Sequence, residues 1–295
     1  MGTSGQLDFL ALDDAYAIAY VEASMARMPT WQMEPAAPAT KVERKDPQLL
    51  GILASAENAA LGELELDVFA WIVTAWFVTG RPADGQVKAS YSQIARALYG
   101  KAEGGRQYEL IDQALRRLRK VILSLSVLEF VGDQEVWEER EDLNVLHQLK
   151  TRRRLRGGED PTVGRITLAL DGWLVQQLDA QTVVALAWQV IRKLSGRSKR
   201  LALYLAAHAS AFAPITQHTE RLEIELCTAF YEELGISAAR ERDRRGSVTR
   251  AASRIAEHDP RYNRLDVVKI KNGKYVLRAD RPTGGAVLPL PTRTR

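Results

Sequence analysis

The feature that most constrains this chain is an arginine-rich helical pattern that runs directly into a short hairpin pattern. In residues 241–258, "ERDRRGSVTRAASRIAEH", small and apolar residues from Val248 to Ile255 recur at helical spacing, so they should share one inward face. The hairpin turn follows at Asn272-Gly273, a pair that favours a two-residue type I′ turn because both central residues need a positive φ. The order predicts a DNA-recognition helix followed by a basic wing.

Both elements should present charge on their exposed sides. The helix residues expected to contact a polyanion are Arg244, Arg245, Ser247, Arg250 and Arg254. Pairing the strands outward from Asn272-Gly273 places Ile270 opposite Tyr275 and Val268 opposite Leu277 on a buried face. The other face is then expected to carry Lys269, Lys271, Lys274 and Arg278.

An earlier region has the same order of elements. Residues 67–78, "DVFAWIVTAWFV", predict a buried helix, and "SYSQIARALYG" predicts a second helix capped by Ser90 and stopped by Gly100. The next helix, "RQYELIDQALRRLRKVILSL", has an apolar face of Ile111, Leu115, Leu118 and Ile122 and an exposed face of Arg106, Gln113, Arg116, Arg117 and Lys120.

Strands are expected next. The segments "SVLEFVGD", "DLNVLHQLKT" and "RITLAL" predict strands, and a basic tip with Arg152, Arg153 and Arg154 lies between the last two. The acidic run at residues 135–142 is expected to be a solvated loop rather than a metal site.

In the C-terminal half, "KRLALYLAAHASAF" predicts a buried helix. The segment "RLEIELCTAFYEELGI" predicts the counterpart of the Ser90 helix, ending at Gly235. We therefore expect a mainly α fold with small β-hairpins (α+β), built from two tandem winged-helix domains. The expected divisions are a flexible arm (1–48), a first domain (49–190), a second domain (191–281) and a disordered tail (282–295).

Charge is unevenly distributed between the two halves. Residues 1–150 hold 15 Lys and Arg against 22 Asp and Glu, whereas residues 151–295 hold 26 against 15, so net charges of −7 and +11 sum to +4. A cationic half favours a nucleic-acid or anionic-membrane partner, although an arginine-rich solvated surface would give the same balance.

Motifs for catalysis and cofactors are missing from the sequence. No phosphate-binding glycine loop is present, the four histidines are scattered, and the single cysteine rules out an intrachain disulfide or a multi-cysteine metal site. The longest apolar runs are too short to cross a membrane, and no secretory signal is readable. We expect a cytoplasmic protein that is not an enzyme and binds neither a metal nor a cofactor.

The segment from Trp173 to His208, in which a helix leads into "SKRLALYL", resembles a junction in known proteins. It is similar to the point at which plasmid replication initiators of the Rep and TrfA-like family begin their second winged helix. The resemblance in element order covers about residues 50–280. It implies sequence-specific binding of double-stranded DNA at directly repeated origin sites (iterons), opening of an adjacent A·T-rich stretch and helicase loading. If a homodimer forms off DNA, we expect it to use the first domain, whose exposed face is acidic or apolar.

A short peptide near the N-terminus adds a second resemblance. "QLDFL", with Gln6, Leu7, Phe9 and Leu10, is similar to the peptide by which bacterial proteins dock on the sliding clamp, with Leu and Phe exchanged at its last two positions. Its apolar residues would fill a pocket on the clamp, or alternatively pack back on the first domain.

Two rival functions use the same sequence features. A dimeric winged-helix transcriptional repressor would bind one palindrome with two-fold symmetry, and a partner-binding protein would offer its basic faces to an acidic protein. Salt dependence and a footprint on DNA would separate the partner-binding protein from the initiator and the repressor, which both bind DNA.

Overall fold

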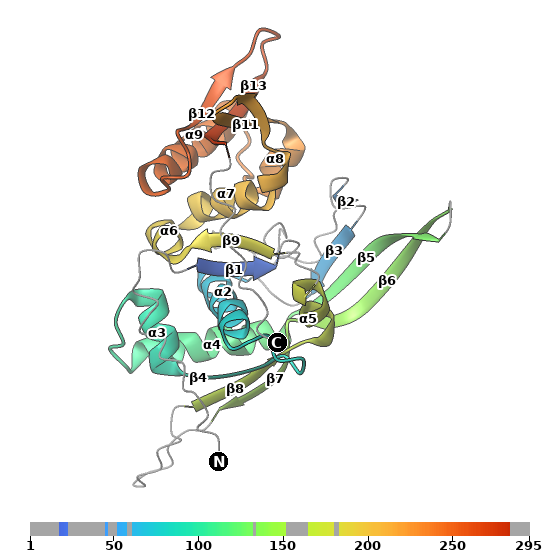
Figure 1. Cartoon of the computed structure of the whole chain (residues 1–295), viewed down its shortest axis with the longest axis vertical. Coiled ribbons are helices and arrows are strands. Elements are labelled where there is room, and N and C mark those ends of the chain that lie inside the picture. Colours follow the sequence, from blue (N-terminus) through green and yellow to red (C-terminus); the bar gives the residue numbers. More distant parts are fainter. Residues whose placement is uncertain are drawn as a thin grey trace.

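The chain forms two units stacked along the long axis of the molecule, each with helices packed on a small antiparallel sheet (Figure 1). The computed structural model describes residues 18–22, 45–46, 52–57, 61–131, 134–151, 165–179 and 183–283. Two clusters of buried side chains form the cores, one centred on each unit, and Leu203 of the second unit belongs to the first cluster.

The first unit combines three helices with a three-stranded sheet. Its elements are α2 (Glu63–Val78), β4 (Gln86–Ser90), α3 (Tyr91–Tyr99), α4 (Arg106–Lys120), β7 (Leu146–Thr151) and β8 (Arg165–Leu170). Helix α2 is apolar on nearly all sides and is therefore buried at the centre of this unit. At the start of α3, Ser90 and Gln93 cap each other's backbone N–H groups, and Gly100 ends the helix with φ +77°, as predicted.

The second unit repeats this order. It contains α7 (Gly196–Ala207), a 3₁₀ turn η3 (Ala209–Ala211), β10 (Ala213–Thr216), β11 (Thr219–Glu225), α8 (Thr228–Glu233), α9 (Glu241–His258), β12 (Arg264–Lys269) and β13 (Tyr275–Pro282). The sheet order is β4-β8-β7 in the first unit and β11-β13-β12 within the second, so the last strand is central in both. The predicted α+β fold with two winged-helix units is confirmed.

One predicted helix is wrong in its first half. The stretch starting at Arg221 is strand β11, and only Thr228–Glu233 is helical. Leu222 and Ile224 pack on the core because they alternate with the charged residues Arg221, Glu223 and Glu225, which is the period of a strand.

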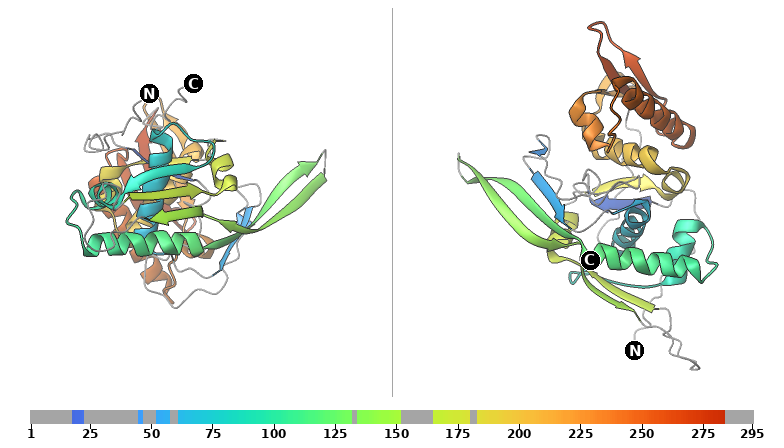
Figure 2. Two further views of the ribbon diagram at one scale, coloured as in Figure 1. Left: turned by 90° about the horizontal axis from the view of Figure 1, so that it is seen from below. Right: turned by 180° about the vertical axis from the view of Figure 1, so that it is seen from behind.

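A long hairpin is inserted into the first unit. Strands β5 (Ile122–Val131) and β6 (Gln134–Asn144) join β2 (Lys45–Asp46) and β3 (Ile52–Glu57) in a sheet of order β2-β3-β5-β6. The hairpin extends away from the body of the molecule in every view (Figures 1 and 2). The acidic run at 135–142, expected to be a loop, is instead part of β6.

A two-stranded ribbon lies between the two units (Figure 1). Its strands are β1 (Ile18–Glu22) and β9 (Val183–Ala187), followed along the chain by α6 (Trp188–Lys193), while α5 (Gly172–Asp179) precedes β9. Val21 of β1 is buried in the first core, so this part of the predicted flexible arm is an ordered strand. Helix α6 contributes to both cores, because Trp188 lies in the first and Val190 in the second.

Polar contacts seat the first helix of the second unit on the first helix of the first unit. Lys199 of α7 is buried, and its Nζ lies 2.8 Å from both carboxylate oxygens of Asp67 and 2.8 Å from Glu63 Oε1. Glu63 also accepts the N–H of Gly196 at 2.8 Å. Burial raises the pKa of Asp67 to about 6 although Lys199 opposes the shift. This junction fixes α7 on α2.

In the part of the chain that the structure describes, no helix has the length and apolar character needed to cross a membrane.

Candidate nucleic-acid interface

Helix α9 has one buried face and one exposed face. Val248, Ala251, Ala252 and Ile255 are buried in the second core, as predicted. Arg250 and Arg254 are exposed, also as predicted. Two further residues on the exposed side, Arg242 and Gly246, were not anticipated, although counting 100° per residue from Val248 places both there.

Arg244 and Arg245 lie at the flanks of α9 and make contacts within the protein. Arg244 donates a hydrogen bond to the carbonyl oxygen of Ala238, and its guanidinium lies 5.8 Å from the centre of the Tyr231 ring. The guanidinium of Arg245 lies 3.8 Å above the ring of Tyr275 on β13. Arg245 therefore connects α9 to the wing, because a cation over an aromatic face is attracted by the ring.

Ser247 does not lie on the exposed face that the sequence predicts. Its side chain is buried, and its hydroxyl accepts a hydrogen bond from Arg197 on α7. The contact joins α7 to α9, so Ser247 orients the helix from behind. The position lies about 100° from Val248 on the helix, at the border between the two faces, and only the packing of α7 decided its side.

The register of the β12–β13 hairpin differs from the prediction by one residue. Its loop has three residues, Lys271 to Gly273, closed by hydrogen bonds of 2.9 Å between Ile270 N and Lys274 O and between Gly273 N and Ile270 O. Gly273 alone takes a positive φ, of +84°, in this loop. Such a loop adds one residue relative to a type I′ turn.

The extra residue exchanges the two faces of β12. Val267 lies opposite Leu277, and Lys269 lies opposite Tyr275, so Val268 is not on the core-facing side. Shifting a strand pairing by one residue moves every side chain to the other face. The prediction that the outer face carries a row of lysines is therefore wrong.

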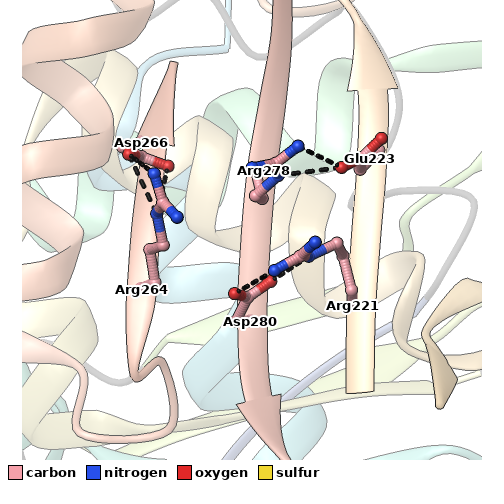
Figure 3. A network of polar contacts seen from close by, with 6 residues as sticks. All are labelled: Arg221, Glu223, Arg264, Asp266, Arg278 and Asp280. Carbon is pink, nitrogen blue, oxygen red and sulfur yellow. Dashed lines mark hydrogen bonds and ion pairs between the residues drawn. The ribbon is translucent and has the colours of Figure 1, made fainter. Parts of the chain in front are cut away.

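The outer face of this sheet is an array of paired charges (Figure 3). Asp280 is held by Arg221 at 2.7 and 2.8 Å, Glu223 by Arg278 and Asp266 by Arg264, each at 2.7 Å at the closest approach. The hydrogen bonds from Arg221 lower the pKa of Asp280. Because its three arginines are matched by three carboxylates, this face offers little net charge to a polyanion.

The three predicted wing lysines have different surroundings, and all are exposed. Lys274 forms an ion pair of 2.8 Å with Glu225. Lys269 lies 6.0 Å from the centre of the Tyr275 ring. Lys271 is in the loop and makes no hydrogen bond or ion pair with any residue that the structure describes. Lys271 is therefore the wing cation best placed to meet a phosphate.

Helix α4 is the counterpart of α9 in the first unit. Ile111, Leu115 and Leu118 are buried as predicted, but Ile122 begins strand β5 instead of extending the helix. Arg106, Gln113, Arg116, Arg117 and Lys120 are all exposed, as expected.

Two of these arginines are already paired. Arg116 contacts Asp112 at 2.9 Å, and Arg117 forms an ion pair with the buried carboxylate of Glu65 on α2. Asp112 also accepts a hydrogen bond of 2.6 Å from the hydroxyl of Tyr91. The exposed cations of α4 without such a partner in the described chain are Arg106, Arg119 and Lys120.

Helices α4 and α9 both lie toward the viewer when the molecule is seen from behind (Figure 2). The two helices therefore lie on one side of the molecule. Arg152, Arg153 and Arg154 of the first wing, and the peptide with Gln6, Leu7, Phe9 and Leu10, lie outside the described residues.

Comparison with known proteins gives a likeness in fold only. No family model matches the chain, and no curated protein matches it. Among solved structures, one of domains 2 and 3 of RctB superposes with a TM-score of 0.59 at 10% identity, covering 89% of this chain and 98% of that one. A second structure of RctB domains 2–3 gives a TM-score of 0.54 at 12% identity over 87% and 96% of the two chains. The chain is similar to these tandem winged-helix domains over nearly their whole length.

Proposed function

We propose that this protein is a sequence-specific, double-stranded DNA-binding replication initiator that binds directly repeated origin sites. One observation carries the proposal: two winged-helix units of the same strand order, joined by a buried ion pair, present basic helices on one side. RctB, whose domains 2 and 3 share this fold, is a Vibrio chromosome-2 replication initiator, which supports the same role here.

Helix α9 would read base edges in one major groove. Arg250 and Arg242 project from its exposed face without partners in the described chain, and arginine bound to guanine O6 and N7 is the commonest specific contact. Lys271 at the wing tip would position the protein on phosphates, which carry no sequence information. Arg106 and Lys120 of α4 would serve a second groove. Arg244, Arg245 and Ser247, now engaged inside the protein, would support α9 rather than touch bases.

The junction between the units would set the geometry of the site. With α7 fixed on α2, two recognition helices can reach successive major grooves on one face of a duplex, about 10–10.5 base pairs apart. We therefore expect one chain to cover a direct, non-palindromic site of about 20 base pairs. Bending of DNA on binding, which costs on the order of 1–6 kcal/mol, would promote opening of adjacent A·T-rich DNA and loading of a helicase.

The experiment is to select binding sites from a random duplex pool and then measure, on one minimal site, both the protected length and the mass of the complex. A single chain over about two helical turns supports the proposal. Two chains on an inverted repeat would show a dimeric repressor instead, and no selection of any sequence would exclude both. The variant Lys193→Ala, which removes an exposed lysine of α6, is the control for a loss of charge away from the candidate interface.

A further inference from the structure

The exposed face of α9 contains an acidic residue in the middle of its basic side chains. Asp243 lies in the first turn of the helix, is exposed, and follows Arg242 directly. Its carboxylate makes no hydrogen bond or ion pair with any described residue. By contrast, the other carboxylate on this face, Glu257, lies 3.4 Å from Arg254.

The exposed face of α9 has no side chain at one position between Asp243 and Arg250. Gly246 lies between them, and a Cβ atom built there would meet only Nη1 of Arg250, at 3.5 Å. The guanidinium of Arg250 therefore leans back over Gly246, toward the start of the helix, which is the usual direction of helical side chains. Asp243 lies three residues before Gly246, which is about 4.5 Å along the helix axis at about 1.5 Å per residue.

The axial separation of Gly246 and Asp243, about 4.5 Å, lies between one and two base-pair steps of about 3.4 Å. An arginine head group and a carboxylate so arranged fit a guanine and a cytosine in adjacent pairs, because guanine presents two acceptors in the major groove and cytosine an amino donor. Without a side chain at position 246, the Arg250 head group can lie close to the helix backbone on the same face as Asp243.

We propose that Asp243 is a specificity-determining residue that accepts a hydrogen bond from the N4 amino group of a cytosine next to the guanine bound by Arg250. The inference rests on the proposed function. The negative charge of Asp243 has a second effect. On a non-cognate duplex the carboxylate enters a phosphate-rich groove without an amino donor, and repulsion between like charges then weakens binding. Asp243 thus lowers affinity for other DNA more than for the cognate site.

The test compares Asp243→Asn and Asp243→Ala with the unchanged protein on the selected site, on every single-base variant of it, and on a scrambled duplex. In the unchanged protein, replacing the contacted cytosine should weaken binding about 5- to 150-fold, the range for one mismatched base pair in a specific site. In Asp243→Asn, this preference should change to adenine at that one position, because asparagine pairs with adenine N6 and N7. Asp243→Ala should lose the preference without acquiring another, and both variants should bind the scrambled duplex more tightly.

Glu257→Gln is the matched control, since it removes an equal charge from the same face near the other end of the helix and should leave the base preference unchanged. A circular dichroism spectrum identical to that of the unchanged protein establishes that each variant is folded. If Asp243→Ala keeps the cytosine preference, or if both variants tighten all duplexes equally, the role of Asp243 is refuted while the proposed function stands. If the unchanged protein selects no sequence at all, the proposed function fails first.

Discussion

Replacing Lys199 with methionine tests whether the two units form one cooperative structure. The side chain of Lys199 is 4% exposed and neutralises two carboxylates of α2, Asp67 and Glu63, each at 2.8 Å. Methionine keeps the length and the apolar stem of lysine but removes the charge. Two carboxylates would then face each other in the junction without a cation.

The expected loss follows from the burial of these groups. Removing one partner of a buried ion pair costs about 3–5 kcal/mol, because an uncompensated charge remains inside. Here the side chains of Asp67 and Glu63 are 19% and 33% exposed, so water reaches both in part. We therefore expect Lys199→Met to lower the free energy of unfolding by about 3 kcal/mol, at the lower end of that range.

Tryptophan fluorescence and far-UV circular dichroism separate the two units during urea unfolding. All six tryptophans, the last being Trp188, precede α7 in the chain, so fluorescence reports the first unit and the junction, whereas circular dichroism reports both units. In the unchanged protein the two transitions should coincide. In Lys199→Met the midpoints of both transitions should shift to lower urea concentrations, and the two transitions should no longer coincide. Lys193→Met, at an exposed lysine of α6, should shift either transition by less than about 0.5 kcal/mol.

A double variant supplies the internal check. Lys199→Met combined with Asp67→Leu removes the ion pair but leaves no buried charge on Asp67, and apolar replacement of both partners is often neutral. The double variant should therefore recover part of the stability that Lys199→Met loses. The inference that the junction holds the units together fails if Lys199→Met is as stable as Lys193→Met. It also fails if the losses in the free energy of unfolding of Lys199→Met and Asp67→Leu simply add in the double variant.

Three further predictions concern DNA binding and pH. If the basic faces neutralise about 6–10 phosphates, log affinity should fall against log salt with a slope of about −0.9 per phosphate in a fluorescence anisotropy titration; a nearly flat response would remove DNA as the partner. Arg250→Ala should weaken the selected site by about 1–3 kcal/mol and spare unrelated duplexes, whereas Lys271→Ala should weaken all duplexes alike, and equal behaviour of the two variants would contradict the placing of the recognition helix. The raised pKa of Asp67, about 6 against 3.8, means that the folded chain holds an extra proton between these pH values. The contribution of Asp67 to the free energy of unfolding therefore falls as pH rises through this window, by up to about 3 kcal/mol. Urea titrations at pH 4.5 and 6.5 should show this fall in the unchanged protein but not in Asp67→Asn.

Local periodicity in the sequence determined the helices and their order. The apolar stripes of α4 and α9, the cap at Ser90 and the stop at Gly100 depend on side chains within one or two turns of each other, so they are readable from a short window. The same reasoning placed Arg250 and Arg254 on an exposed face. The strand β11 was also readable, since Leu222 and Ile224 alternate with charged residues, but the expectation of a repeated helix took precedence over the period of two.

The register of the wing strands follows from the length of one loop. Asn272-Gly273 permits either a two-residue turn or a three-residue loop with only the glycine at positive φ, and the two differ by one residue in every strand pair that follows. Which loop forms depends on whether Leu277 and Val267 or Leu277 and Val268 face the core, and the core also includes α7 and α9. A choice of this kind depends on packing over the whole unit.

Contacts between residues far apart in the chain were decided by the tertiary structure alone. Lys199 meets Asp67 across 132 positions, Arg117 meets Glu65 across 52, and Arg197 holds Ser247 across 50. The sequence shows how many cations the chain has, but which of them are neutralised depends on which carboxylates the fold brings within reach. For that reason the composition predicted a polyanion-binding half, and only the folded chain separates Arg250 and Lys271, which stay available, from Arg117 and Arg278, which are already paired.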